Sequence, residues 1–174
     1  MNIQLTSKNV KLRLIVESDA QFILELRLND SLNRYLSEVD DNLNRQIEWI
    51  KNYKIREALK KEFYFIIENN RNELIGSVRL YDFLENSFSW GSWILNNKKS
   101  PTSAIESALL VYQFGFNNLS FQKSHFEVMK ANKNVISFHE KWGAHRTGEN
   151  EEYFFYEISA QAVNKVRQKF NKLL

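Results

Sequence analysis

The sequence has no cysteine, one proline and five glycines in 174 residues. Without cysteine the chain forms no disulfide, no thiolate metal site and no acyl-cysteine intermediate. Its three histidines, at positions 125, 139 and 145, follow no familiar metal-binding spacing, so we expect no metal site. No apolar run is long enough for a membrane span, and Met1–Gln4 lacks the basic and apolar regions of a signal peptide, so we expect a cytoplasmic protein.

The composition is that of a globular chain with a sizeable core. Hydrophobic residues make up 43% and aromatic residues 14%, which excludes a disordered protein. The length fits one domain, over residues 1–174. A net charge of +3 is compatible with nucleic acid or anionic ligands, but the basic residues are scattered among 21 acidic ones. We therefore expect an ordinary solvated surface and no nucleic-acid partner.

The first half of the chain is predicted to form one strand, two helices and three further strands. Val10–Val16 alternates apolar and basic residues, which indicates a half-buried strand. Ser18 is the expected cap of a helix that ends near Asn29, and a second helix with an apolar stripe runs from about Asn44 to Lys60. Short polar turns join the next three strands into an antiparallel meander: Phe63–Glu68, Leu74–Phe83 and Phe88–Leu95.

The second half alternates helices and strands. The helix from Ala104 to about Asn118 is apolar on nearly every face, so we expect it to be buried across the sheet. Gly143 is the expected stop of a short helix, and Ser159 is the expected cap of the last one. The other elements are a strand at Lys123–Met129, a helix at Val135–Trp142 and a hairpin of Ala144–Gly148 with Tyr153–Ile158.

The junction before the central helix is a natural anion site. A strand ending at Leu95 passes through the loop Asn96–Ser103 into the helix that begins at Ala104, whose first N–H groups are unpaired at the positive end of the helix dipole. Ser103 and Glu106 have the spacing of a capping box. The alternative is an ordinary capped helix with solvated lysines, which are Lys98 and Lys99.

The order of elements, β-α-α-β-β-β-α-β-α-β-β, with a phosphate-type loop before the central helix, resembles the GCN5-related N-acetyltransferase (GNAT) fold. The resemblance covers nearly the full chain. It implies an α/β (α+β) architecture with a central mixed, mostly antiparallel sheet and flanking helices.

In GNAT proteins this loop carries Gln/Arg-x-x-Gly-x-Gly/Ala, whose backbone N–H groups hold the pyrophosphate of coenzyme A. The matching segment here is Lys99–Ala104, in which Thr102 replaces the first glycine. Thr102 and Pro101 restrict the backbone, and Pro101 lacks a donor, so either the loop takes another path with hydroxyls assisting or binding is weak. We favour the first alternative, with coenzyme contacts at Lys99, Thr102, Ser103, Ala104 and Ile105.

The segment Asn132–Ala144 (NKNVISFHEKWGA) is similar to a second GNAT motif, Asn-x-x-Ala/Ser-Ile/Leu-x-Leu/Phe-Tyr-x-Lys-x-Gly-Phe. The resemblance implies that Asn132, Phe138 and Lys141 contact the coenzyme. His139 stands where the family has a tyrosine that commonly protonates the departing thiolate. We expect His139 to be either that acid, as an imidazolium near neutral pH, or a half-exposed helix residue without a role.

Two shorter segments narrow the resemblance. Arg27–Asp30 with Asn33–Leu36 is similar to the RimJ/RimL-like branch, and Trp90–Leu95 (WGSWIL) is similar to sugar-amine acetyltransferases of polysaccharide biosynthesis. The side chains expected to line the acceptor pocket are Arg27, Arg79, Tyr81 and Trp90; the alternative for Trp90 and Trp93 is that they are core aromatics.

With no cysteine and no Gly-x-Ser-x-Gly nucleophile elbow, acetyl transfer would be direct, in a ternary complex. A splayed fourth strand would expose backbone N–H groups around Trp93, Ile94 and Leu95 to pantetheine and to the thioester oxygen. The acceptor amine must lose a proton before it attacks. The candidate bases are Glu127 and Asp82, each of which is otherwise a surface carboxylate.

We therefore expect an acetyl-CoA-dependent N-acetyltransferase of a small-molecule primary amine, first of all an amino sugar on a nucleotide carrier. The alternative within the same class is a RimJ/RimL-like acetyltransferase of protein N-termini. The alternative from another class is a non-catalytic acyl-CoA-binding domain, which the glycine-poor loop favours. The protein is expected to be a monomer or a homodimer.

Overall fold

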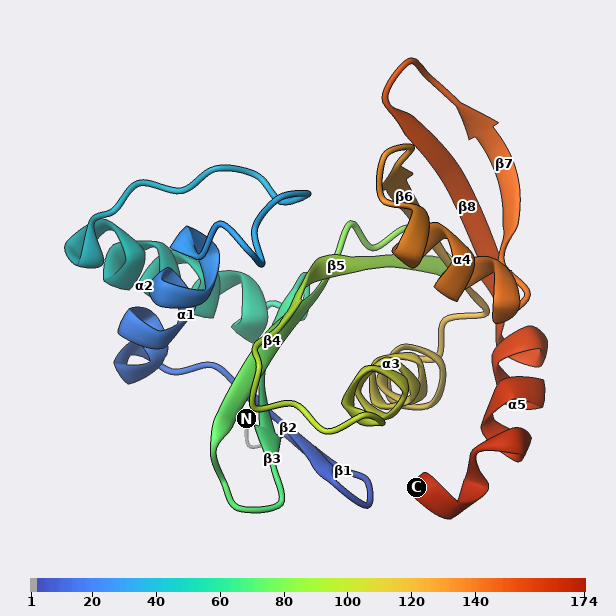
Figure 1. The fold of residues 1–174 in the computed structure, drawn as a ribbon, viewed down its shortest axis with the longest axis horizontal. Helices are drawn as coiled ribbons and strands as arrows, with labels where there is room; N and C mark the ends of the chain where they lie inside the picture. Colours follow the sequence, from blue (N-terminus) through green and yellow to red (C-terminus); the bar gives the residue numbers. More distant parts are fainter. Residues whose placement is uncertain (1–2) are drawn as a thin grey trace.

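Helices cover both faces of an eight-stranded sheet in the computed structural model, which describes residues 3–174 (Figure 1). The strands lie in the order β1-β2-β3-β4-β5-β6-β8-β7, and every neighbouring pair is antiparallel except β5 with β6. The predicted mixed, mostly antiparallel sheet is therefore confirmed, with β1 as an additional strand. The bounds are β1 Gln4–Thr6, β2 Val10–Leu14, β3 Phe63–Asn69, β4 Leu74–Tyr81, β5 Ser87–Leu95, β6 Lys123–Met129, β7 His145–Glu149 and β8 Tyr153–Ser159.

The helices divide between the two faces of the sheet. Figure 1 shows α1 and α2 on one side, and α3 on the concave side between the sheet and α5. The bounds are α1 Ala20–Leu28, α2 Leu43–Ala58, α3 Ser103–Gln113, α4 Lys133–Lys141 and α5 Ala160–Lys169, with short helical turns at Glu17–Asp19, Phe114–Asn118 and Asn171–Leu173.

The alternation of β3 explains its continuous hydrophobic sequence. Phe63, Phe65 and Ile67 pack in the larger core cluster beneath α3. Tyr64 and Ile66 point to the opposite face and pack in a smaller cluster with residues of α1 and α2. Since both faces are covered, every second residue of β3 enters a different core.

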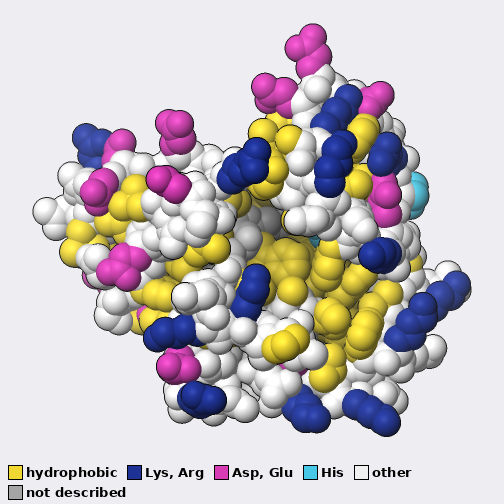
Figure 2. Space-filling model, in the orientation of Figure 1, with side chains coloured by type: hydrophobic (Ala, Val, Ile, Leu, Met, Phe, Trp, Pro, Cys, Tyr) yellow, Lys and Arg dark blue, Asp and Glu magenta, His cyan; other side chains and the backbone are white. Residues whose placement is uncertain are grey.

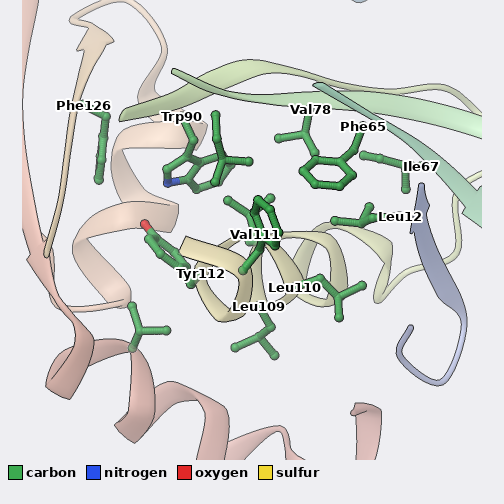
Figure 3. Packing of buried hydrophobic residues seen from close by; sticks show 14 of the residues in the cluster. Leu12, Phe65, Ile67, Val78, Trp90, Leu109, Leu110, Val111, Tyr112 and Phe126 are labelled. Carbon is green, nitrogen blue, oxygen red and sulfur yellow. The ribbon is translucent and has the colours of Figure 1, made fainter. Parts of the chain in front are cut away.

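The α3 helix is buried on nearly every face, as predicted. Leu110, Val111 and Tyr112 are fully buried, and Figure 3 shows the helix packed against the apolar residues of the sheet. The helix continues into a single π turn at Phe114–Asn118, where Gly115 lies against the ring of Phe88. A Cβ atom on Gly115 would lie 2.2 Å from that ring, so the close approach of helix and sheet requires glycine.

Two predicted helix caps are wrong. The N-cap of the first helix is Asp19 and not Ser18, and the Asp19 side chain does not cap α1. Its carboxylate accepts instead from the Val16 N–H at 2.8 Å and from Arg13 at 2.7 and 2.8 Å. The predicted capping box of Ser103 with Glu106 does not form either, because both side chains are buried and engaged elsewhere.

Glu106 instead joins the β1–β2 turn to the start of α3. Its carboxylate accepts from the backbone N–H of Asn9 at 2.7 Å, the amide of Asn9 at 2.9 Å, the hydroxyl of Ser7 at 2.7 Å and the hydroxyl of Thr102 at 2.6 Å. Four donors satisfy this fully buried carboxylate, so the cost of burying its charge is offset locally.

Within residues 3–174, no helix combines the length and the apolar character needed to cross a membrane. Met1 and Asn2, which belong to the stretch assessed for a signal peptide, lie outside the described residues.

Candidate active site

The parallel strands β5 and β6 separate after a short contact. They pair only at Ser87 with Lys123 and at Phe88 with Ser124. From Ser89 onward, the edge of β5 that faces β6 has no strand partner among the described residues. The predicted splayed strand is therefore confirmed, and its free N–H and C=O groups face a gap.

A bulge bends β5 beside this gap. Gly91 pairs with Arg79 and Ile94 pairs with Ser77, so Ser92 and Trp93 together oppose a single residue of β4. Ser92 takes a positive φ of 47°, which non-glycine residues rarely adopt. Bulges of this kind change the direction of a strand and of its backbone donors.

A cavity of about 450 Å³ occupies the gap. It is lined by the β5 bulge, β6, α4 and the loop between α1 and α2, and the hydroxyl of Tyr35 in that loop donates to the carbonyl of Ala131 at 3.3 Å. Through this hydrogen bond, the α1–α2 loop contacts the segment that follows β6. Figure 2 shows hydrophobic side chains gathered in the hollow between β5, α3 and α4.

His139 lies in the wall of this cavity and is only 5% exposed. Its ring packs 4.2 Å from the ring of Phe126 and 5.5 Å from that of Trp90, centroid to centroid. Burial lowers the pKa of His139 to about 3, so the ring is neutral at neutral pH. The predicted half-exposed position is wrong, because the motif does not show how deeply the aromatic cluster buries the ring. The role of His139 as the acid stays a prediction, which its lowered pKa disfavours.

Three polar side-chain atoms are buried in this aromatic cluster: Trp90 Nε1, the Tyr112 hydroxyl and His139 Nδ1. The Trp90 and Tyr112 ring centroids are 5.4 Å apart, and Figure 3 shows their polar ends directed toward the same space beside Phe126. Sequence reasoning placed Tyr112 only in the core, whereas the structure shows that its hydroxyl is buried beside Trp90, where burial raises its pKa well above the ordinary value.

The two predicted bases lie in different surroundings. Glu127 is exposed, lines the cavity, and has no ion pair or side-chain hydrogen bond in the part of the chain that the structure describes. Asp82 does not line the cavity. Its carboxylate lies 3.1 Å from Nε2 of His125, whose Nδ1 contacts the hydroxyl of Ser87. The structure therefore brings Glu127, and not Asp82, to the gap.

The loop before α3 holds itself together through its hydroxyl groups. The Ser100 N–H donates to Oγ of Ser103 at 2.9 Å, and the Ser103 N–H donates back to the carbonyl of Ser100 at 3.1 Å. Ser103 is fully buried, so the predicted coenzyme contact at Ser103 is not available. Thr102 is likewise engaged, because its hydroxyl donates to Glu106.

Two backbone donors remain at the start of α3. The N–H groups of Ala104 and Ile105 have no hydrogen-bond partner among residues 3–174. They lie in the first turn of the helix, where the dipole is positive. Lys99, in the preceding loop, is exposed and adds a positive charge.

The other predicted coenzyme residues flank the same gap. Asn132 lines the cavity and caps α4, since its Oδ1 accepts from the Val135 N–H at 3.3 Å. Phe138 packs against Trp93, with ring centroids 5.3 Å apart. Lys141 is exposed and does not line the cavity. The side chains of Ile94 and Leu95 are buried in the core, so only the backbone of these two residues is left for ligand contacts.

The predicted acceptor residues fall into two groups. Tyr81 and Trp90 line the cavity, with Trp90 also part of the core. Arg27 and Arg79 line an adjoining hollow of about 270 Å³, and Ser92 lies in the lining of both. Among the described residues, no cluster of three His, Asp or Glu side chains is arranged to hold a metal ion.

A family model described as "Acetyltransferase (GNAT) domain" matches residues 9–145, which is most of the chain. This chain is a GNAT acetyltransferase. The enzyme resembles the solved structure titled "Apo FdhC- a nucleotide-linked sugar GNAT", with 47% identity over 100% of this chain and 99% of that one, and a TM-score of 0.92.

More distant relatives share the fold. The SPbeta prophage-derived N-acetyltransferase YokL of Bacillus subtilis (strain 168) is 25% identical over 154 residues, which cover 86% of this chain and 84% of YokL. The ribosomal-protein-S5-alanine acetyltransferase of Vibrio fischeri is 12% identical, with a TM-score of 0.77 over 90% of this chain and 96% of that one. That likeness shows the fold alone.

Membership of the GNAT family implies the use of acetyl-CoA. The residues present fit this group, because the unpaired N–H groups of Ala104 and Ile105 can receive phosphate oxygens and the open edge of β5 can receive an extended amide chain. The loop lacks the glycines of the GNAT motif, but hydrogen bonds to Ser103 and Glu106 hold it in a conformation that leaves the Ala104 and Ile105 N–H groups unpaired.

Proposed function

We propose that this acetyltransferase transfers an acetyl group to the amine of an amino sugar carried on a nucleotide. The observation that carries the proposal is the 47% identity, over the full chain, to a protein titled as a nucleotide-linked sugar GNAT. The cavity supports it as well, because a volume of about 450 Å³ is suited to a small acceptor.

Acetyl-CoA, when bound, supplies an activated thioester, and the chain's own groups provide positioning and proton transfer. Glu127 is the proposed base: its unpaired carboxylate lines the cavity and can take a proton from the acceptor ammonium group. The backbone donors of the β5 bulge around Trp93 lie at the open strand edge and stabilise the charge that develops on the thioester oxygen.

His139 contributes differently from the prediction. A neutral ring in an apolar wall does not donate as an imidazolium, so its proposed part is to shape the cavity beside Trp90. Proton delivery to the departing thiolate is then left to groups that line the cavity with a hydroxyl, of which Tyr35, Tyr81 and Tyr153 are present.

The substitution Glu127→Gln tests the base. It keeps the shape of the side chain and removes the proton acceptor, so kcat should fall by about 100-fold or more while the KM for acetyl-CoA changes little. Steady-state release of free CoA is the measurement. The matched control is Glu85→Gln, an exposed carboxylate outside the cavity, which should retain full activity. A Glu127→Gln enzyme with the wild-type kcat and pH profile would remove Glu127 from this role.

A further inference from the structure

Two basic residues, Arg27 and Arg79, and one acidic residue, Glu38, line the hollow next to the catalytic cavity. It is lined by α1, α2, the loop between them and the strands β3 to β5, and it adjoins the catalytic cavity, because Ser37 and Ser92 line both. A ligand in the cavity can therefore be followed toward this hollow along Ser37 and Ser92.

Arg79 brings an incompletely compensated charge to this hollow. Its Nε atom donates to the buried carboxylate of Glu62, and Nε of Arg56 donates to the same carboxylate at 2.8 Å. The single negative charge of Glu62 is therefore shared by two positively charged guanidinium groups. The two terminal nitrogens of Arg79 have no partner within residues 3–174, so they can receive an anion in a bidentate arrangement.

The same hollow has a rigid aromatic wall. Trp49 stacks on Tyr53 at 5.8 Å with an interplanar angle of 2°, and it meets Tyr64 edge-on at 5.8 Å. The guanidinium of Arg79 lies 5.3 Å from the centroid of Trp49. The guanidinium of Arg56 lies 5.5 Å from the same centroid, so Tyr53, Arg56 and Arg79 enclose the Trp49 ring, which holds the Arg79 guanidinium in place beside the hollow.

Arg27 supplies a second guanidinium on the other side of the hollow. One terminal nitrogen donates to the carbonyl and the hydroxyl of Ser37, at 2.8 and 2.7 Å, which ties the α1–α2 loop to α1. Its other terminal nitrogen, Nη1, has no hydrogen-bond partner among the described residues. Two arginines thus line the hollow from different elements, and each has an unpaired terminal nitrogen.

We infer that this hollow binds the nucleoside diphosphate part of the acceptor, with the diphosphate on Arg79 and Arg27. The inference rests on the proposed function, since it names the site at which the nucleotide carrier of the amino sugar binds. It explains why two arginines and a tryptophan surround a space that the acetyl transfer itself does not use.

The first test is direct binding. Isothermal calorimetry of the wild-type enzyme with a nucleoside diphosphate alone should show one site, and the diphosphate should inhibit acetylation competitively with the acceptor. Absence of binding at millimolar diphosphate would overturn the inference even if the enzyme acetylates a nucleotide-linked amino sugar. Binding of the diphosphate without acetylation of any such sugar would instead contradict the proposed function, so the two failures are distinguishable.

The second test is Arg79→Met, which keeps the aliphatic stem and removes the donors. The KM for the nucleotide-linked amino sugar should rise by about 10–100-fold, while the KM for acetyl-CoA and the rate with the free amino sugar stay unchanged. The double variant Glu62→Gln/Arg79→Met removes both charges and guards against misfolding of the single variant. Arg167→Met, on α5, is the matched control. An equal loss with the free and the nucleotide-linked sugar would overturn the inference.

Discussion

The carboxylate of Glu106 is predicted to be a main determinant of stability at the coenzyme loop. In Glu106→Gln, an amide nitrogen replaces one of two oxygens that together accept four hydrogen bonds. The hydroxyls of Ser7 and Thr102 can reverse direction and accept, but the two N–H donors of Asn9 cannot. One N–H donor of Asn9 therefore loses its carboxylate acceptor wherever the amide nitrogen is placed; its backbone N–H would have no acceptor left, and its amide would keep only the Thr102 hydroxyl at 3.4 Å.

The size of the effect follows from these contacts. One unsatisfied buried donor costs about 1–3 kcal/mol, and loss of charge from the remaining hydrogen bonds costs about 1 kcal/mol more. We expect the free energy of unfolding to fall by about 2–4 kcal/mol at pH 7. For a chain of this length, that corresponds to a melting temperature lower by about 4–16 °C.

The effect should depend on pH with a defined sign. Burial alone would raise the pKa of Glu106, but its four donors hold the pKa below the ordinary value of 4.5. A lowered pKa gives stability that is present above the ordinary value and is lost as the pH falls through the folded-state pKa. The difference between wild type and Glu106→Gln should therefore be largest at pH 7 and shrink below pH 4.5.

Urea unfolding at a series of pH values, followed by tryptophan fluorescence, measures this difference. The matched control is Glu157→Gln, which removes a partly exposed carboxylate paired with Lys123 at 2.7 Å and should cost less than about 1 kcal/mol. Equal stabilities of Glu106→Gln and wild type at pH 7, or a difference that does not change with pH, would refute the reasoning.

Two further substitutions test the packing around the site. His139→Phe should leave the pH profile of kcat/KM between pH 6 and 9 unchanged, because the pKa of His139 is already lowered to about 3 by burial. If the wild-type profile falls off near pH 6–7 and the variant's profile does not, the ring is not neutral and the prediction is contradicted. Gly115→Ala should destabilise the protein by about 1–3 kcal/mol in thermal unfolding, because its Cβ would meet the Phe88 ring at 2.2 Å. Gly148→Ala, whose Cβ would lie at an ordinary 3.5 Å from Phe155, is its control and should lose much less; equal stability of the two variants would contradict the packing.

The elements could be predicted from the sequence because their signals are local. The strand Lys123–Met129 has the same bounds in prediction and structure, and Ser159 caps the last helix as its position indicates, accepting from the Ala162 N–H at 3.2 Å. Gly143 ends α4 with a φ of +91°, a conformation that favours glycine. Each of these depends on residues within a few positions of one another.

The site could be predicted only in part, because its environment is made by distant residues. Three of the four donors to Glu106 belong to Ser7 and Asn9, 99 and 97 positions away, so a local capping box is the wrong interpretation of a correct helix start. The burial of His139 depends on rings from β5 and β6, which the motif around it does not contain.

The acceptor preference tests the central claim most directly. The rate of CoA release should be measured with a nucleoside-diphosphate-linked amino sugar, a peptide with a free N-terminus and a polyamine, each over a range of concentrations. The account predicts a kcat/KM for the nucleotide-linked amino sugar that exceeds the other two by about 100-fold or more. A higher kcat/KM for the peptide or the polyamine would contradict it.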